Sequence, residues 1–302
     1  MSRCRPFGRL FNSLVACGGI TIILGAMYCA DAQSQAAATL FASQSAVVLT
    51  GTVVRIRASE EPLLPANDST IVIKVANVLS GRDIVGDQSG RLATVVLAKA
   101  GTVKAHSTGT FFGNPRFVGK TITITDVGEI VSPPSGGFAA ATAFVGAVSI
   151  GTQQYHDAPI RARLDIANLV FTGTVESEHA LVDAQSTARQ AQDSNPEWHV
   201  ATVRVATSLR GSRSGQVIFV IFSSSRSVGF INKPKLVSGE SALIIAHAPS
   251  AEEQAELQPF GALTIQDQKG TQQIPELVTS PYDVLPPDSS ARVLQLLKME
   301  LK

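Results

Sequence analysis

The sequence is poor in the residue types that build disulfide frameworks, metal sites and aromatic binding surfaces. Its 302 residues include three cysteines, one tryptophan and five histidines. Cys4, Cys17 and Cys29 all stand near the amino terminus, so the rest of the chain has no thiol for a disulfide or a thiolate ligand. No two histidines have the i,i+2 or i,i+4 spacing of common zinc sites. We therefore expect no metal and no cofactor. A metal site assembled from distant residues is the remaining alternative.

The chain also lacks an excess of charge of either sign. Lys and Arg number 25 and Asp and Glu number 24, which gives a formal net charge of +1. A surface for nucleic acid or anionic lipid needs a clear positive excess. We therefore expect no nucleic-acid partner and no electrostatic attraction to a membrane.

The amino terminus combines basic residues with an apolar run too short to span a membrane. Arginines at positions 3, 5 and 9 precede the apolar stretch Leu14–Tyr28, which three glycines interrupt. A spanning helix needs about 20 apolar residues. This order predicts a secretory signal peptide over residues 1–32, cleaved between Ala32 and Gln33. A membrane anchor and lipidation at Cys29 are the alternatives, and the aromatic residue before Cys29 disfavours lipidation.

Cleavage there would leave a mature chain without cysteine and without a transmembrane span. It removes three arginines and Asp31, so Lys and Arg fall from 25 to 22 and Asp and Glu from 24 to 23. A chain of about 270 residues can bury a core in each of two units without disulfides. We expect a secreted or periplasmic protein whose stability comes from packing.

An internal repeat is the strongest positive signal. The segment Ala46–Val54 (AVVLTGTVV) returns as Asn168–Val175 (NLVFTGTV). Three further pairs follow in the same order, namely Ile71–Gly81 with Ala201–Gly211, Gly90–Leu97 with Gly215–Phe222, and Pro115–Ile124 with Pro234–Ile245. Alternating and β-branched residues in these segments predict strands. We expect Gly51 and Gly173 to occupy equivalent places, and any site to lie where the two units differ.

The pattern predicts a mainly β fold of two tandem OB-like small β-barrel units with a few peripheral helices. A β-sandwich for each unit is the alternative, because strand patterns are common to both. The expected parts are the first unit at 33–131, a Pro/Gly/Ala-rich linker at 132–158 and the second unit at 159–302. Helices are expected over Phe138–Ile150, packed between the units, over Pro159–Asn168, and over Ala291–Lys302, where Leu294, Leu297 and Leu301 face the second unit.

The order of these strands resembles the netrin-like OB-fold modules, the barrel class of the tissue inhibitors of metalloproteinases. The likeness covers Ala46–Leu97 and Ala167–Phe222, where a Gly-x-Val strand, a strand ending Val-x-x-x-Leu-x-Gly and an apolar strand follow one another. The resemblance would imply that an amino-terminal cysteine binds the zinc ion of a protease, as in those inhibitors. The mature chain has no cysteine, so inhibition by that route is not carried over.

Two segments imitate catalytic motifs. Gly113–Thr121 resembles a phosphate-binding loop, but five residues separate its glycines where the motif has four, and a strand pattern follows it instead of a helix. Gly239–Leu243 starts like a nucleophile elbow but has leucine at the second glycine position. We interpret Gly119-Lys-Thr and Gly239-Glu-Ser as the same turn in the two units, and we predict no catalytic residue in either segment.

The remaining candidates are single side chains. The five histidines are His106, His156, His179, His199 and His247. Ser241 and His247 would lie roughly 20 Å apart in a straight strand, too far for a catalytic pair. Trp198, the sole tryptophan, is a ligand-surface candidate, although we expect it to cap the second barrel. Glu253 with its acidic neighbours predicts a solvated helix surface.

We therefore expect an exported, non-enzymatic binding or structural protein built from two duplicated β-units. Its partner would be an unknown envelope or extracellular protein or a small ligand. An exported hydrolase with a site assembled from distant residues is one alternative, and a protease inhibitor-like module is another. The hydrolase would need a serine, a histidine and an acid that converge in one cleft.

Overall fold

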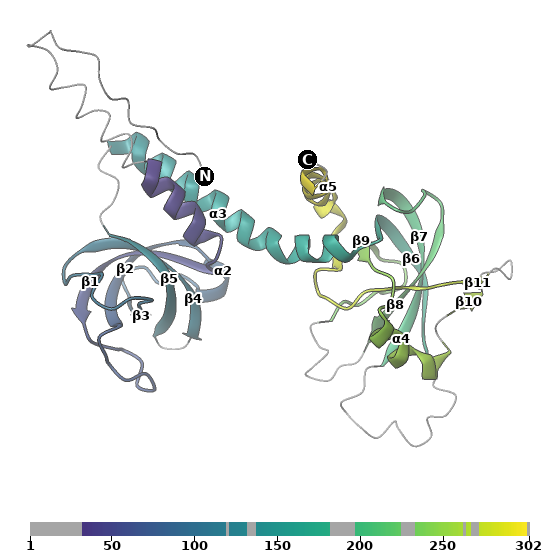
Figure 1. Ribbon diagram of the computed structural model, residues 1–302, viewed down its shortest axis with the longest axis horizontal. Coiled ribbons are helices and arrows are strands. Elements are labelled where there is room, and N and C mark those ends of the chain that lie inside the picture. The colour runs from purple at the N-terminus through teal and green to yellow at the C-terminus, as the bar shows by residue number, and fades with distance from the viewer. Residues whose placement is uncertain are drawn as a thin grey trace, which may run out of the picture. The chain divides into compact units, whose positions relative to one another are not determined.

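The computed structural model describes residues 32–118, 121–131, 137–181, 197–224, 233–261, 264–266 and 272–300. The chain divides into two compact units, Met1–His156 and Asp157–Lys302, each described by itself. Both are mainly β, with few helices (Figure 1). The expected signal peptide lies outside the described residues except for Ala32, so cleavage between Ala32 and Gln33 stays a prediction.

The first unit is a closed five-stranded barrel in the order β1-β2-β3-β5-β4. Its strands are β1 (Val47–Ile56), β2 (Thr70–Ser80), β3 (Leu92–Val96), β4 (Thr108–Val118) and β5 (Ile122–Val131). Only β3 and β5 are parallel neighbours among these strands. Alternate apolar side chains such as Leu49, Ile73 and Phe111 fill the interior. The barrel expectation is confirmed for this unit, and the sandwich alternative is wrong for it.

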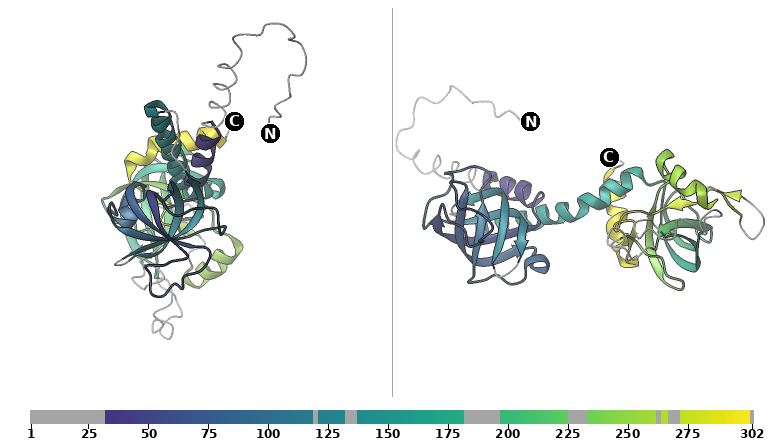
Figure 2. Two further views of the ribbon diagram at one scale, coloured as in Figure 1. Left: turned by 90° about the vertical axis from the view of Figure 1, so that its left-hand side faces the viewer. Right: turned by 90° about the horizontal axis from the view of Figure 1, so that it is seen from below.

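Two helical segments lie beside this barrel (Figure 2). Residues 32–42 form one of them, and the first half of α3 (Gly137–Ile166) forms the other. The short helix α2 (Arg82–Val85) follows β2. Phe144, Ala147 and Val148 of α3 form one buried cluster with Ala38, Ala42, Val48 and Phe112. The expected helix over Phe138–Ile150 is therefore present and packs on the first barrel, whereas its packing between the units stays a prediction.

The separate helix expected over Pro159–Asn168 is wrong. Helix α3 continues through Pro159 to Ile166, so most of the segment expected as a linker is also helical. A proline inside a helix removes one backbone hydrogen bond and clashes with the preceding turn. Buried contacts downstream offset that cost, because Leu164 is fully buried beside Val170 and Leu243 in the second unit. Tertiary packing has overridden the local signal for a helix start.

The second unit contains a six-stranded sheet in the order β12-β8-β7-β6-β9-β13. Its strands are β6 (Leu169–Ala180), β7 (Trp198–Arg210), β8 (Val217–Ser223), β9 (Ser241–Ala246), β12 (Glu276–Leu277) and β13 (Val284–Leu285). A single bridge between His247 and Leu277 joins the end of β9 to β12. The remaining elements are α4 (Ala251–Leu257), η1 (Gln258–Phe260), the β10 (Ile265–Gln266) and β11 (Gln272–Gln273) pair, η2 (Pro287–Ser289) and α5 (Ser290–Glu300).

The two Thr-Gly-Thr-Val strands have the same pairing pattern. In β1 the register against β2 shifts between Thr50 and Gly51, and in β6 the register against β7 shifts between Thr172 and Gly173. The glycines are needed because a Cβ at Gly51 would lie 2.6 Å from the Lys74 carbonyl oxygen, and one at Gly173 would lie 2.8 Å from that of Arg204. The close approach of two backbones explains why both strands have a glycine at this position.

The proposed match of Gly119-Lys-Thr with Gly239-Glu-Ser is wrong. Gly239 donates its amide to the Val175 carbonyl, as His106 does to the Val53 carbonyl, so the residue of the first unit that bonds as Gly239 does is His106. Both have positive φ, 87° for Gly239 and 65° for His106. Gly119 lies outside the described residues. The two false motifs still fail on structure, because strands β5 and β9 stand where helices would be required.

Helix α5 docks on the second unit through a slightly different face than expected. Its buried side chains are Val293, Leu296 and Leu297, whereas Leu294 is only half-buried. They pack against Leu164 in the same apolar cluster. The expected docking is thus confirmed, while the expected face is turned by about one position.

Candidate functional site

The two units differ in the strand that completes the sheet, which is β5 in the first unit. In the first unit β5 is continuous, with Ile124 opposite Val95 and Ile130 opposite Thr110. In the second unit the corresponding pairs are made by two short strands, β12 and β13, with residues 278–283 between them. The connection from β9 to β12 also carries α4. A network of polar side chains gathers at this place.

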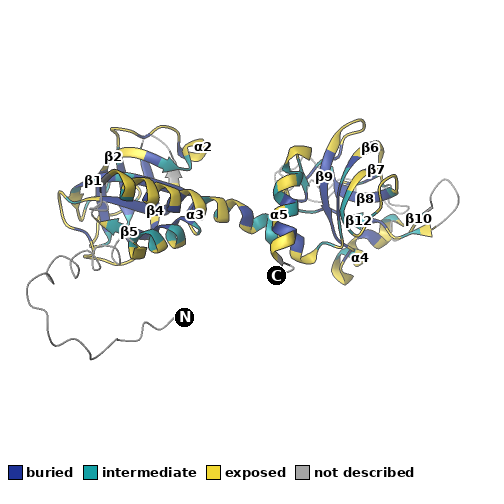
Figure 3. Ribbon diagram, turned by 90° about the horizontal axis from the view of Figure 1, so that it is seen from above, coloured by how far each residue is buried: buried dark blue, intermediate teal, exposed yellow. Residues whose placement is uncertain are grey.

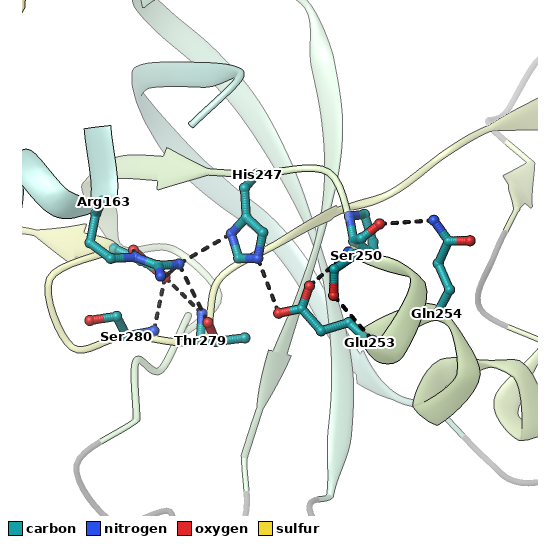
Figure 4. A network of polar contacts seen from close by, with 9 residues as sticks. Arg163, His247, Ser250, Glu253, Gln254, Thr279 and Ser280 are labelled. Carbon is teal, nitrogen blue, oxygen red and sulfur yellow. Dashed lines mark hydrogen bonds and ion pairs between the residues drawn. The ribbon is translucent and has the colours of Figure 1, made fainter. Parts of the chain in front are cut away.

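Asp283 and Arg163 form the centre of this network. Figure 4 shows Arg163 between His247 and the segment with Thr279 and Ser280. Arg163, near the end of α3, donates from Nε and Nη2 to the two carboxylate oxygens of Asp283, at 2.5 and 2.9 Å. Asp283 is fully buried, and its Oδ2 also accepts the backbone amides of Thr279 and Ser280, both at 2.8 Å. A bidentate pair with further amide donors compensates the burial of the charge. The carboxylate thereby fixes the loop between β12 and β13.

His247 lies between a cation and an anion, which decides its tautomer. Its Nδ1 is 3.2 Å from Nη2 of Arg163, and its Nε2 is 3.2 Å from Oε1 of Glu253. A guanidinium has only donors, so Nδ1 must accept and the proton must be on Nε2. Nε2 then donates to Glu253. Both ring nitrogens are occupied, and His247 is 8% exposed, so it has no free lone pair for a substrate.

Glu253 connects His247 to the start of α4. Ser250 caps this helix, with its Oγ accepting the Glu253 amide at 3.3 Å, while Oε2 of Glu253 accepts the Ser250 amide at 2.8 Å. Burial acts to raise the pKa of Glu253, but the hydrogen bonds from Ser250 and His247 outweigh it and lower the pKa. The expected solvated surface is wrong for this residue, because Glu253 is an ordered acceptor in a capping box.

Two further pairs attach α3 to the second unit. Arg292 of α5 forms an ion pair with Asp157, which is 1% exposed. Arg210 donates to the carbonyl oxygen of Leu164 at 2.7 Å. Nearby, Asn168 donates to Glu276 at 2.9 Å, and burial raises the pKa of that glutamate. These contacts mark the polar cluster as an attachment point for the end of α3.

The arrangement does not activate a nucleophile. Ser250 contacts Glu253 rather than His247, so the serine has no base within reach. Ser241 of the false elbow shares a 2.9 Å hydrogen bond with Thr174 across the strands. The other histidine–carboxylate pair, His199 with Glu178 at 2.8 Å, lies on the exposed side of β6 and β7. Over the described part of the chain, no three His, Cys, Asp or Glu side chains gather as metal ligands do.

Trp198 is part of the core of the second unit. It is 7% exposed and belongs to a cluster with Phe219, Leu257 and Leu277. It therefore packs in the same cluster as Leu257 of α4 and offers little surface for stacking, while the capping role stays a prediction. Arg163 and Asp283 were not among the sequence candidates, whereas the Ser250-x-x-Glu253 capping box is a local signal that could have located one end of the network.

The first unit contains one unusual carboxyl group. Asp126 is 5% exposed at a bulge in β5, where it lies opposite Gly113, and neither carboxylate oxygen has a hydrogen-bond partner. Burial and, to a smaller extent, the neighbouring Glu129 together raise the pKa of Asp126 to about 8, against a smaller lowering effect of the Ala98 and Gly128 amides. This carboxyl group is therefore protonated in the folded unit at neutral pH.

No protein-family model matches the chain, and no curated protein is significantly similar to it. Among the described residues, no helix is both long and apolar enough to cross a membrane.

Proposed function

We propose that this chain is an exported, non-enzymatic binding protein built from two duplicated OB-like units. The proposal rests on the observation that the His247 network has no free catalytic group. Its histidine is held by Arg163 and Glu253 on both ring nitrogens and touches no serine. The most elaborate polar cluster of the described chain thus serves to hold a loop and a helix in place, which leaves surface recognition as the role of the barrels.

The duplication is supported by pairing that recurs along the chain. Three register shifts occur in β1 and three in β6, at positions that are each 122 residues apart. Gly90 and Gly215 both donate to the strand residue that follows the outward basic residue, Val75 or Val205. The bridge of His247 to Leu277 matches the pairing of Asn114 with Thr125. A common five-stranded barrel plan accounts for all of these at once, as the netrin-like resemblance would imply.

Export and inactivity are tested on the same preparation. The full chain is expressed with its own amino terminus in a bacterial host, and mass spectrometry of the recovered protein is expected to show Gln33 as the first residue. Retention of residues 1–32 would overturn export. The protein is then incubated with chromogenic ester, peptide, glycoside and phosphate substrates. Turnover above that of a heat-inactivated sample, and lost on His247→Gln, would overturn the non-enzymatic assignment.

A protease inhibitor-like role is the second candidate, because one loop combines rigidity with an exposed apolar tip. Leu63 is 80% exposed in the loop between β1 and β2. The loop is held by Glu60, whose amide donates to Thr94 Oγ1 at 2.9 Å, and by Ser59, whose Oγ accepts the Glu61 amide at 3.0 Å. A preorganised loop loses little conformational entropy on binding.

Titration of serine proteases with leucine-accepting pockets tests this second role. Saturable inhibition is expected, with a loss of at least about tenfold for Leu63→Ala, since removal of a buried anchor costs more than 1.4 kcal/mol. Ile274→Ala is the matched control, because Ile274 is similarly exposed at 73% on the second unit. Equal effects of the two substitutions, or no inhibition, would exclude the loop as the recognition element.

A further inference from the structure

The first half of α3 is uncharged on every side and largely apolar, with Thr142, Ser149, Thr152, Gln153 and Gln154 as its polar residues. From Ile130 to Tyr155 the sequence contains no charged residue. A surface helix of a soluble protein has a polar face opposite its buried one, and a helix that is apolar all round is buried. The exposed side of this helix therefore differs from the surface of an ordinary peripheral helix.

One side of α3 is already occupied by the first barrel and by the helical segment at 32–42. Phe144, Ala147 and Val148 are buried there, and Thr39 Oγ1 donates to the Ala147 carbonyl oxygen at 3.2 Å. A Cβ at Gly151 would collide with the backbone of Thr39. The two helical segments are thus in close contact and form one layer on the barrel.

The other side of this layer is open, uncharged and largely apolar. Leu40 is 55% exposed, Phe138 89%, Val145 52% and Ile150 57%. In Figure 3 much of the ribbon of α3 beside the first barrel has the colour of exposed residues. A Cβ at Gly146 would meet no atom within 4 Å, so this side has room for another backbone. We call this surface, made by the exposed residues of 32–42 and 137–154, the helical face.

We propose that the helical face binds the same face of a second copy of this chain. A patch without charge attracts neither a positively nor a negatively charged partner. Its best electrostatic match is another uncharged patch. Two-fold symmetry supplies that match, because both copies present the same surface.

The extent of the helical face agrees with a small symmetric interface. Four residues of 32–42 and eleven of 138–154 are exposed. A standard interface uses about 20–30 residues a side, so we expect a reversible dimer rather than an obligate one. The small residues Ala139, Ala143 and Gly146 allow two helices to approach closely. Apolar patches of this kind on a soluble protein mark interaction sites.

Sedimentation equilibrium of the full chain under reducing conditions tests the proposal. The wild type is expected to show a monomer–dimer equilibrium, and Val145→Glu is expected to weaken dimerisation by at least about tenfold, because two like charges would be buried face to face. Val237→Glu is the matched control, since Val237 is 49% exposed on the second unit. It should leave the equilibrium unchanged. Circular dichroism verifies that both variants remain folded.

Cross-linking locates the contact. In a chain whose three natural cysteines are changed to serine, Val145→Cys should form a disulfide-linked dimer under mild oxidation, and Val237→Cys should not. A monomeric wild type at all concentrations would overturn the proposal, as would a dimer that Val145→Glu leaves intact. Equal cross-linking of the two cysteine variants would also overturn it. Neither readout depends on export or on enzymatic inactivity.

Discussion

Replacement of Asp126 by asparagine should stabilise the first unit above acidic pH. The buried carboxyl group has a pKa of about 8 in the folded unit, against 3.8 for an ordinary aspartate. In the folded unit it keeps its proton up to about pH 8, whereas the unfolded chain releases it above about pH 4. As far as this group is concerned, the free energy of unfolding is therefore highest below about pH 4. It falls as the pH rises from about 4 to about 8 and stays low above about pH 8. Asparagine has nearly the same shape and cannot ionise, so the variant should escape this loss.

The size of the effect follows from the pKa difference. Each unit of pKa difference corresponds to about 1.36 kcal/mol, so a window of about 4 units sets a ceiling near 6 kcal/mol. Local relaxation and partial hydration of the charge reduce this, and we expect a gain of roughly 2–4 kcal/mol for Asp126→Asn at pH 8. At pH 4 the variant and the wild type should have nearly the same free energy of unfolding.

Urea unfolding between pH 4 and pH 8.5 checks the prediction. Circular dichroism follows both units, while the fluorescence of Trp198 follows only the second, so the difference isolates the first barrel. Asp83→Asn on exposed α2 is the control and should change little at any pH. The reasoning is refuted if Asp126→Asn destabilises the first unit at pH 8, or if the variant keeps the pH dependence of the wild type.

Three further predictions concern the second unit and the strand glycines. Asp283→Asn should cost about 3–5 kcal/mol, because it leaves the Arg163 charge buried without its partner; an unchanged urea midpoint from Trp198 fluorescence would contradict the central role of this pair. Gly173→Ala should lower Tm by several degrees, because its Cβ would meet a carbonyl oxygen, whereas Gly146→Ala on the open helix should not; equal effects in calorimetry would argue against the close approach. Glu253→Gln should lower the free energy of unfolding at neutral pH, because the pKa of Glu253 is lowered in the folded unit and its carboxylate stabilises the fold there. The wild type has this stability above the ordinary glutamate pKa and loses it on acidification. A variant as stable as the wild type at pH 7 would exclude that contribution.

Strands and strand glycines could be predicted because their signals are local. The alternation around Lys74 and Arg204 gave the correct exposed positions, and Gly51 and Gly173 occupy matching bulges. The turn at Gly239 was matched to the wrong place, since register depends on pairing with β6, which no local pattern encodes. His106, a non-glycine residue with positive φ, conceals the true counterpart in the first unit.

The polar network could not be predicted because its members come from distant segments. Arg163 and Asp283 are 120 residues apart in the chain and meet only once α3 and the loop before β13 have packed. Neither residue carries a sequence motif. The network lies in the connection between β9 and β13, while the expectation that a functional site lies where the units differ stays a prediction.

The different closure of the two sheets sets how each can open. Along β4 and β5 the first barrel is closed by pairing from Gly109 to Val118, so opening it would break a whole ladder. The corresponding seam of the second unit is closed at one end by two backbone hydrogen bonds between His247 and Leu277, of 3.2 and 2.9 Å. Local opening there leaves every other ladder intact, so amide exchange at Leu277 should be faster than at Thr125, which pairs with Asn114 in the first barrel. Helix α4 lies in the connection that leaves the sheet after β9 and returns at β12, so this seam is where the chain can depart from the sheet without disturbing its remaining strands.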